Sequence, residues 1–509
     1  MRRPLVVVAL TAALGLSGLL PATASEAPEP SAPSSPAQAL ATVQRLLDLS
    51  APLARTARTG RPEVSLAMRD LFAALPRLDD ADRRTAQGYL ARPTDGAADG
   101  LGDGYTVPAK KKCRNHLCIH WVPTTADAPP STAWVKKNLS FMNKVWRVEV
   151  RKMGYRKPVS DRHRGGNAKF DVYLKELGSR GIYGYCTPER RAPGQKWLAS
   201  GYCVLDNDFA EAQYGAPPVQ SLRVTGAHEF FHAVQFAYDY GEDPWLMEST
   251  ATWMEERVAD DVNDNRQYLP YGQVGAPGQA LDLFNRQGFN QYGNWTFFEY
   301  LSHRFGLGVV KQIWARAGAY RGAGHQYSTT AVKGVLKKHG GFGSVYRGFA
   351  AANTAPGHYY PEGKAWPVAP TFAGWTLTHD APRQHARTTI SHMSSRNAIV
   401  RPAASMKDKR WRLRVVVDGP AGKTEPSAYV LSKTKRGFNG TPIRLNGKGK
   451  GHALVGFGAS RVVWAKVVLV NGSTRFSCWH RTSWSCQGKA RDDQEGFAVR
   501  VTAVPPRKK

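Results

Sequence analysis

The chain is 509 residues long and strongly basic, with 70 Lys and Arg against 40 Asp and Glu and a formal net charge of +30. Beyond the first 20 residues it contains no apolar run of the roughly 20 residues that a membrane helix requires, which excludes a multi-span membrane protein. No nucleic-acid-binding module is recognisable, so we do not expect nucleic acid as the partner of the positive charge.

Residues 1–24 have the pattern of a signal peptide. Arg2 and Arg3 supply the basic start, Leu5–Leu20 the apolar stretch, and Ala22-Thr23-Ala24 a small-residue cleavage site. We therefore expect a secreted, extracellular protein with no transmembrane segment.

Six cysteines in an exported chain predict disulfide bonds. Of the 15 possible pairings we expect the local ones: Cys113–Cys118, Cys186–Cys203 and Cys478–Cys486. An alternative for the first pair is a small metal site made by Cys113, His116, Cys118 and His120, although this spacing fits no standard zinc module.

Residues 25–105 precede the region that carries the chemistry. Ser25–Gln38 is rich in Pro, Ser, Ala and Glu and predicts a disordered lead-in. Helices are expected beyond it, for instance Ala41–Leu53 and Pro62–Leu75, and the Gly/Asp-rich run Asp95–Gly104 predicts a linker. Two interpretations stay open: a pro-segment that is removed, or a helical appendage that stays packed on the rest of the protein.

Residues 106–365 begin with strands and one long helix. The helix is expected at Thr132–Met153, where apolar residues recur at helical spacing. Strands are expected at Leu117–Val122, Phe170–Leu174, Tyr183–Cys186 and Tyr202–Leu205. An edge strand of such a small sheet can hold an extended peptide by strand addition. Asp206-Asn207-Asp208 is interpreted as a turn, because three polar residues are too few for a calcium site.

The segment His228-Glu-Phe-Phe-His232 lies on a predicted helix, Ser221–Tyr240. Residues four apart project from one face of a helix, so the ring nitrogens of His228 and His232 can meet on one zinc ion, with Glu229 beside it. The alternative is a buried histidine pair satisfied by hydrogen bonds.

A third ligand must come from elsewhere. Gln235 and Tyr238 stand where a metzincin has Gly and His, which excludes that class. Asp243-Pro244 predicts the start of the next helix, and Glu248 follows among apolar residues, so we take Glu248 as the third ligand. Glu255, two turns later on the same face, is either a substitute ligand or a partner that orients a histidine.

The segments HEFFH (228–232) and WLMESTATWMEE (245–256) resemble the HExxH and WLNEGFAxYxE elements of the gluzincin aminopeptidases. The resemblance implies that His228, His232 and Glu248 bind zinc and that Glu229 is the general base. Residues 292–301 resemble a stretch of that family in which a tyrosine donates to the oxyanion, which makes Tyr292 the candidate for this role; the alternative is a core aromatic. The family's GxMEN segment, which grips a free amino terminus, is not visible, so we expect an endopeptidase rather than an exopeptidase.

A wider run resembles a family of secreted bacterial metalloproteases without a defined substrate. It comprises Asp171–Gly178, Gly184–Cys186, Asp206–Phe209 and HEFFHAVQFAYD, and it covers roughly residues 105–365. The fold class implied is α+β, with a zincin-like catalytic domain over residues 106–365. That domain would hold a small β-sheet, the HExxH helix and a helical lower subdomain.

Residues 366–509 predict a C-terminal β-sandwich domain. Trp411–Val417 and Phe497–Val501 alternate apolar and polar residues, and Val462–Trp479 predicts a hairpin that turns at Asn471-Gly472. Residues 401–509 hold 23 Lys and Arg against 6 Asp and Glu, which gives +17. An extracellular polyanion, such as a wall polymer, is therefore a candidate partner; the alternative is a basic surface that only keeps the protein soluble.

The sequence thus predicts a secreted zinc peptidase that hydrolyses peptide or protein substrates. His228, His232 and Glu248 would hold Zn²⁺, Glu229 would act as general base, and Tyr292 would steady the oxyanion. The rival hypothesis is a catalytically inactive zincin scaffold that binds a cell surface or a polyanion.

Overall fold

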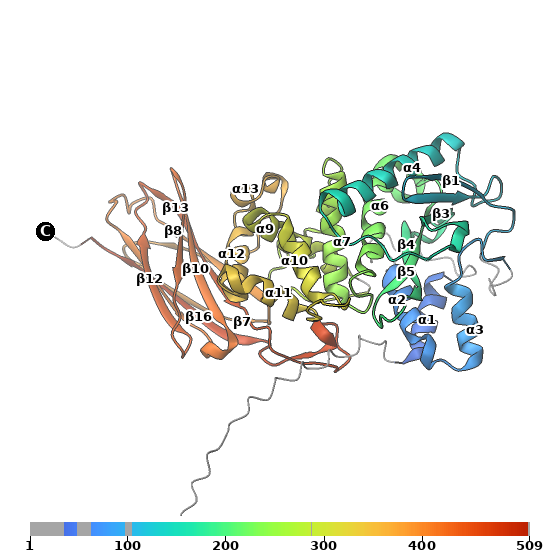
Figure 1. The fold of residues 1–509 in the computed structure, drawn as a ribbon. Helices are drawn as coiled ribbons and strands as arrows, with labels where there is room; N and C mark the ends of the chain where they lie inside the picture. Colours follow the sequence, from blue (N-terminus) through green and yellow to red (C-terminus); the bar gives the residue numbers. More distant parts are fainter. Residues whose placement is uncertain (1–34, 48–62, 97–103, 287, 507–509) are drawn as a thin grey trace, which may run out of the picture.

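The computed structural model describes residues 35–47, 63–96, 104–286 and 288–506 and is a mixed α+β structure with several sheets (Figure 1). The chain runs from a small group of helices through a five-stranded sheet and a helical region to a β-rich C-terminal part. The signal peptide expected at residues 1–24 lies outside the described residues. Within the described ranges, no helix is long and apolar enough to cross a membrane.

The N-terminal unit, residues 35–47 and 63–96, contains α1 (Pro36–Leu47), α2 (Val64–Ala74) and α3 (Asp80–Tyr89). The predicted disordered lead-in is wrong for Pro36–Gln38, because these residues form the first turn of α1, whose apolar stripe faces inward. The rest of that prediction, residues 25–34, lies outside the described residues. Every residue of α2 except Ala73 is buried, so this helix is enclosed by other elements rather than laid on a surface.

Five strands form one sheet in the order β1-β2-β3-β5-β4. β2, β3 and β5 run parallel, while β1 and β4 pair antiparallel at the two edges. The four predicted strands are confirmed as β2 (Leu117–Trp121), β3 (Phe170–Lys175), β4 (Gly184–Arg191) and β5 (Ala199–Asp206), although β4 extends five residues beyond its predicted end. β1 (Lys110–Arg114) is not predicted from the sequence. After β5, the Asp206 carboxylate accepts hydrogen bonds from the backbone N–H groups of Leu177, Gly178 and Phe209, which makes the predicted turn.

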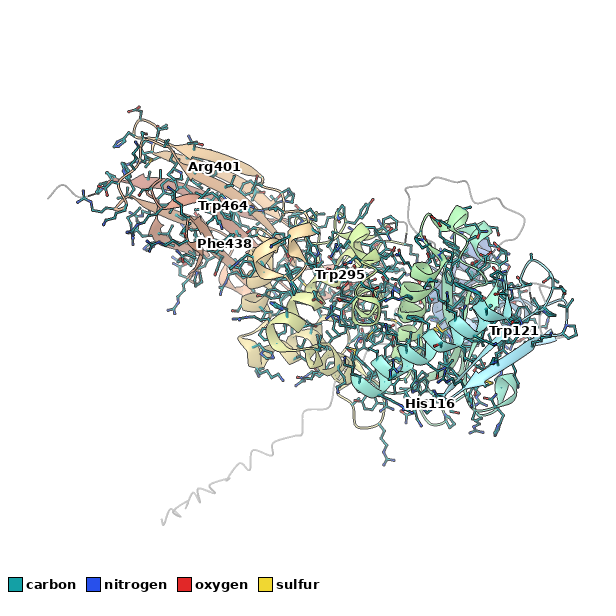
Figure 2. The ribbon with its side chains drawn as sticks, turned by 90° about the horizontal axis from the view of Figure 1, so that it is seen from above. His116, Trp121, Trp295, Arg401, Phe438 and Trp464 are labelled. Carbon is teal, nitrogen blue, oxygen red and sulfur yellow. A yellow bond between two sulfur atoms is a disulfide. The ribbon has the colours of Figure 1, made fainter. Side chains whose placement is uncertain are left out.

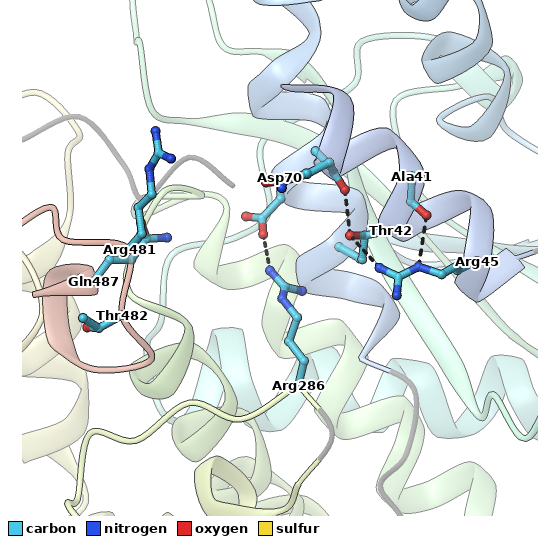
Figure 3. Close-up of a pocket in the computed structure, with 11 residues that line it drawn as sticks. Ala41, Thr42, Arg45, Asp70, Arg286, Arg481, Thr482 and Gln487 are labelled. Carbon is cyan, nitrogen blue, oxygen red and sulfur yellow. Dashed lines mark hydrogen bonds and ion pairs between the residues drawn. The ribbon is translucent and has the colours of Figure 1, made fainter. Parts of the chain in front are cut away.

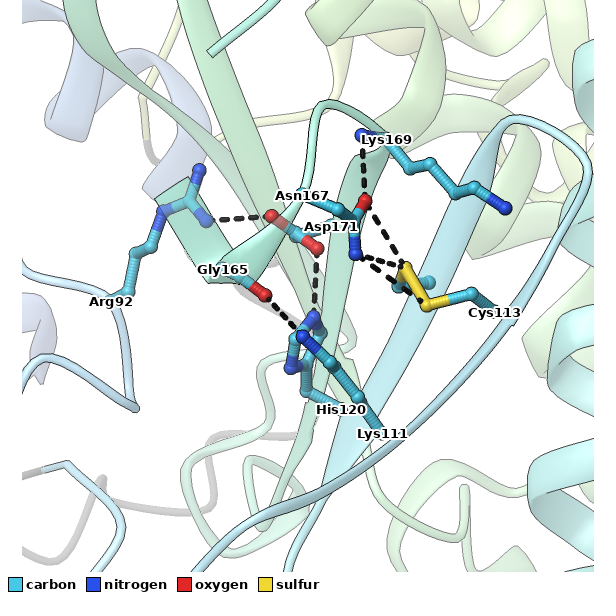
Figure 4. The surroundings of a disulfide bond; sticks show 9 residues. Arg92, Lys111, Cys113, His120, Gly165, Asn167, Lys169 and Asp171 are labelled. Carbon is cyan, nitrogen blue, oxygen red and sulfur yellow. Dashed lines mark hydrogen bonds and ion pairs between the residues drawn. A yellow bond between two sulfur atoms is a disulfide. The ribbon is translucent and has the colours of Figure 1, made fainter. Parts of the chain in front are cut away.

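The three predicted disulfides are confirmed: Cys113–Cys118, Cys186–Cys203 and Cys478–Cys486. The first joins β1 to β2 and the second joins β4 to β5 at directly opposed positions. The alternative metal site is excluded because both of its thiols are used in a disulfide. Its two histidines have other partners: His120 Nε2 lies 2.7 Å from Asp171 Oδ1 (Figure 4). His116 stacks on Trp146.

The sheet is covered by α4 (Thr132–Trp146) and α6 (Pro218–Gln235), which also contact each other. A π-helical turn, Arg147–Lys152, completes the helix predicted to end at Met153. α6 ends at Gln235, five residues before the predicted end, and α7 (Pro244–Ala259) packs against it. The remaining helices are α5 (Glu211–Tyr214), α8 (Asn290–Gly293), α9 (Trp295–Phe305), α10 (Gly308–Ala317), α11 (Thr329–Leu336), α12 (Phe342–Ala352) and α13 (Pro356–Tyr359).

In the C-terminal part, two sheets of orders β11-β10-β13-β8-β6 and β12-β9-β16-β7 share one apolar core. Alternating residues of β9 and β16, such as Leu413, Val415 and Val499, supply that core. The strands are β6 (Ala373–Leu377), β7 (Arg383–Ile390), β8 (Ser394–Pro402), β9 (Arg412–Asp418), β10 (Pro426–Thr434), β11 (Gly437–Ile443), β12 (Lys450–Gly456), β13 (Val462–Asn471), β14 (Phe476–Ser477), β15 (Lys489–Ala490) and β16 (Glu495–Val504).

The hairpin predicted over Val462–Trp479 is wrong. β13 pairs with β10 and β8, whereas β14 pairs with β15. Asn471 does not form an exposed two-residue turn, because it is fully buried and its amide donates to the carbonyls of Ile390 and Asp492.

The β-rich part lies far from the five-stranded sheet. Figure 2 shows Arg401, Phe438 and Trp464 at one end of the molecule and His116 and Trp121 at the other, with Trp295 of α9 between them. The basic C-terminal sheets and the HExxH helix therefore belong to different parts of the molecule.

Candidate metal centre

Two consecutive helices bring the three predicted ligands together. α6 and α7 each begin with a proline, Pro218 and Pro244, whose fixed φ and missing N–H suit the first helical turn. Both helices are buried along most of their length, so their polar side chains face each other inside the protein. His232 and Glu248 are fully buried, and His228 is 8% exposed.

The distances between these side chains match those of ligands around a single ion. Glu248 Oε2 lies 3.2 Å from His228 Nε2, and Glu248 Oε1 lies 3.3 Å from His232 Nε2. Two donor atoms at ordinary zinc distances in a tetrahedron are about 3.4 Å apart. One atom from each of the three side chains lies within 4.8 Å of the others, so the set can surround one cation.

The other ring nitrogens of both histidines are held by acceptors. Nδ1 of His228 lies 2.8 Å from Glu255 Oε1, and Nδ1 of His232 lies 2.8 Å from Gln235 Oε1. Gln235 in turn donates to the carbonyl of Met247, the residue before Glu248. An acceptor at Nδ1 keeps the proton there and leaves the lone pair of Nε2 directed at Glu248. Of the two roles considered for Glu255, substitute ligand or partner that orients a histidine, its contact with Nδ1 of His228 fits the second.

The centre of the cluster is unsatisfied within the chain. His232 Nε2 and both carboxylate oxygens of Glu248 have no hydrogen-bond partner among the described residues. Burial raises the pKa of Glu248 well above its usual range, and the Glu63 carboxylate acts in the same direction. Burial likewise lowers the pKa of His232. A buried carboxylate is costly unless a cation or several donors compensate it, so these groups fit a divalent cation better than a self-satisfied histidine pair.

Glu229 lies beside the cluster and lines the same small cavity as His228 and Tyr292, with a volume of about 40 Å³. Burial raises the pKa of the Glu229 carboxyl to about 7. Its Oε2 accepts a hydrogen bond from Ser65 Oγ at 2.8 Å. A carboxyl that titrates near neutrality is suited both to accept and to return a proton.

Tyr292 of α8 reaches the same place from a third helix. Its ring centroid lies 6.1 Å from that of His228, and its hydroxyl donates to Glu63 Oε2 at 2.6 Å. The side chain is almost fully buried and also contacts the ring of Tyr268. Tyr292 is therefore an aromatic at the wall of the cavity, with its hydroxyl engaged by the N-terminal unit.

Three side chains that contact the site, Gln235, Glu63 and Ser65, are not among the predicted site residues. Gln235 belongs to the polar stripe of the HExxH helix, so its place beside His232 could have been inferred from helical spacing. Glu63 and Ser65 carry no such signal, because they meet Tyr292 and Glu229 across 229 and 164 residues of chain.

Comparison with known proteins gives no family for this chain. No family model matches it, and no curated protein matches it in sequence. Among solved structures, CorA, a surface-associated copper-binding protein of Methylomicrobium album BG8, aligns at 10% identity and a TM-score of 0.16, over 27% of this chain and 99% of that one. A functionally unknown conserved protein of Bacillus anthracis str. Ames aligns at 9% identity and a TM-score of 0.27, over 77% of this chain and 75% of that one. Scores this low carry no argument about fold or function.

Proposed function

We propose that this protein is a zinc-dependent peptidase whose residues 106–365 form a zincin-like catalytic domain. The observation that carries the proposal is the convergence of His228, His232 and Glu248 at ligand spacing, with the three central atoms unsatisfied by the chain. Two imidazoles and one carboxylate form a ligand set that leaves a fourth position of zinc open, as hydrolysis requires. When bound there, zinc supplies a Lewis acid that lowers the pKa of a water molecule and polarises a carbonyl.

The protein's own groups then have separate tasks. Glu229 takes the proton of the attacking water and returns it to the leaving amine, which a carboxyl with a pKa of about 7 can do in both directions. Tyr292, once its hydroxyl is released from Glu63, donates a hydrogen bond to the oxygen on which negative charge develops. Glu255 and Gln235 hold the two imidazoles in one orientation while this happens.

A peptide is the substrate that suits the surroundings of the site. β4 is an edge strand of the sheet, and Gly184 of this strand lines the same cavity as Glu229. An edge strand offers unpaired backbone groups to an extended chain, which fits hydrolysis within a peptide rather than at a bound terminus. The three disulfides support an oxidising, extracellular setting, where the basic C-terminal sheets would meet polyanions.

The test is Glu229→Gln, measured on a broad peptide library together with the zinc content of the purified protein. We expect zinc to be retained and cleavage to fall by about 10²- to 10⁴-fold, because the general base is removed while the ligands remain. Glu211→Gln is the matched control, since Glu211 is exposed on α5, and it should change neither quantity. Unaltered cleavage in Glu229→Gln, or wild-type protein that takes up no zinc, would contradict the proposal.

A further inference from the structure

The N-terminal unit makes direct polar contacts with the groups that the proposed chemistry uses. Ser65 Oγ donates to Glu229 Oε2, and Glu63 Oε2 accepts from the hydroxyl of Tyr292. Glu63 and Ser65 are themselves buried, with 7% and 3% exposure. Glu229, the proposed general base, and Tyr292, the candidate oxyanion donor, are thus both hydrogen-bonded to residues at the start of α2.

The same serine also occupies the edge of the sheet. Besides donating to Glu229, Ser65 Oγ accepts a hydrogen bond from the backbone N–H of Cys186 at 2.9 Å. Cys186 lies on β4, whose other side pairs with β5, so this N–H belongs to the free edge where an extended peptide would add. α2 contacts β4 extensively, which leaves this edge covered.

Little room remains beside the metal ligands. The cavity bounded by Glu63, Val64 and Ser65 on one side and by His228, Glu229 and Tyr292 on the other is about 40 Å³. That volume holds roughly one to three water molecules and no peptide. A substrate can therefore reach the site only if the start of α2 moves.

A buried arginine fixes α2 in this place. The Arg69 guanidinium donates to the carbonyl of Glu242 at 2.7 Å and contacts Met247 Sδ at 3.2 Å, both beside the start of α7. It also binds Asp70, which forms a second ion pair with Arg286 at 2.5 Å (Figure 3). These contacts join α2 to the helix that carries Glu248.

We infer that the N-terminal unit is an internal inhibitor: α2 occupies the peptide-binding position, and the site opens only when α2 is displaced. The inference rests on the proposed function, because it takes the blocked cleft to be a peptidase site. After displacement, the N–H of Cys186 becomes the donor to a carbonyl of the extended substrate. Arg92, at the far end of the unit, stays bound by Asp161, Asp171 and Glu189, so the chain remains attached on that side while α2 leaves.

The experiment measures access to the site separately from catalysis. A tripeptide hydroxamate, a chelating peptide that needs only zinc and an open cleft, is titrated by calorimetry into the zinc-loaded full chain. Arg69→Ala removes the anchor of α2, and Glu63→Ala/Ser65→Ala removes the contacts to Tyr292, Glu229 and Cys186. Arg83→Ala is the matched control, because the contacts of Arg83 go to Asp80, Leu75 and Leu78 within the N-terminal unit.

We expect Arg69→Ala to bind the hydroxamate at least about tenfold more tightly than the wild type does, and the double variant to bind it several-fold more tightly. The affinity of Arg83→Ala should equal that of the wild type. The zinc content should be equal in all four proteins. Equal affinity in wild type and the double variant overturns the inference, even if Arg69→Ala fails to fold. If affinity rises as expected but neither variant cleaves any library peptide, the cleft is blocked by α2 as inferred and the proposed peptidase activity is wrong.

Discussion

Two clusters of buried carboxylates in the described part of the chain are compensated differently. Beneath the N-terminal unit, the Arg92 guanidinium binds Asp161 at 2.7 Å, Asp171 at 2.6 Å and Glu189 at 2.8 Å (Figure 4 shows Arg92 and Asp171). At the candidate metal centre, Glu248 is equally buried, but among the described residues its ion-pair contacts are with His228 and His232 and with no Lys or Arg.

The difference separates a structural cluster from a functional one. Removing a carboxylate from water is costly, and a fold that tolerates this must supply a compensating charge. In the Arg92 cluster the chain supplies that charge itself. In the other cluster, His232 Nε2 and both carboxylate oxygens of Glu248 have no hydrogen-bond partner among the described residues, and the proposed zinc ion would compensate them. Glu248 is singled out by a combination of features: it is buried, neither carboxylate oxygen has a hydrogen-bond partner among the described residues, and two imidazoles lie at ligand distance.

The largest effect should follow from Glu248→Ala. We expect zinc affinity, measured by competition with a chromophoric chelator, to fall by much more than the roughly 10- to 100-fold that loss of an indirect partner causes, because one of three ligands is removed. Asp161→Ala, the matching loss of a carboxylate from the Arg92 cluster, should leave zinc affinity unchanged. Retained zinc in Glu248→Ala would move the third ligand to another acid.

Arg92→Ala should lower the free energy of unfolding and leave the zinc affinity unchanged, whereas the main effect of Glu248→Ala is on zinc affinity. Three carboxylates would stay buried without their cation, which costs about 3–5 kcal/mol when a buried pair is broken. Urea denaturation followed by tryptophan fluorescence measures this change. Arg410→Ala is the control, because the Arg410–Asp408 pair is exposed and its loss should not shift the midpoint. A midpoint that also stays constant in Arg92→Ala would mean that the cluster is not structural.

The contrast between local and distant contacts also explains how far the sequence could predict this protein. His228, His232 and Glu248 lie within 21 positions on two successive helices. Helical spacing grouped the two histidines, and the apolar setting of Glu248 on the next helix, with the gluzincin resemblance, added the third residue. The disulfides could also be predicted because each joins cysteines that are close in the sequence. Arg92, Glu63 and Ser65 meet partners far along the chain, and no periodicity encodes such meetings. The prediction of a hairpin at Asn471 is wrong because the buried side-chain amide of Asn471 donates to the carbonyls of Ile390 and Asp492, and these distant contacts outweigh the local preference of Asn-Gly for a turn.

A smaller effect is expected from the partners of the histidines. Glu255→Ala and Gln235→Ala should each lower zinc affinity by about 10- to 100-fold, because each frees one imidazole to rotate away from Glu248. Glu256→Gln is the control: it is the neighbour of Glu255, but its carboxylate binds Asn265 instead of a histidine. Equal zinc affinities in all three variants would show that the ring orientations are fixed by packing alone.

The smallest effect should come from Asp239, a buried carboxylate with weak compensation of its own. It accepts one hydrogen bond from the N–H of Gly241, its Oδ2 lies 3.7 Å from His325 Nε2, and burial raises its pKa from 3.8 to about 7. The folded chain therefore keeps this proton between pH 4 and pH 7 while the unfolded chain loses it, so the wild type loses stability as the pH rises through that window. The substituted side chain in the Asp239→Asn variant carries no charge at any pH, and its amide oxygen can still accept a hydrogen bond from Gly241. The stability of this variant should therefore not fall between pH 4 and pH 7 on account of this position.

Thermal unfolding at pH 4 and pH 8 measures this difference. The unfolding temperature of Asp239→Asn, relative to that of the wild type, should be higher at pH 8 than at pH 4. Asp261→Asn is the control: its ion pair with Arg223 lowers the pKa of Asp261 to about 2, so the pH dependence of that pair lies below pH 4. The difference between Asp261→Asn and the wild type should therefore stay nearly constant from pH 4 to pH 8. Parallel pH profiles for wild type and Asp239→Asn would mean that the folded protein does not hold the proton of Asp239 above the ordinary pKa of an aspartate.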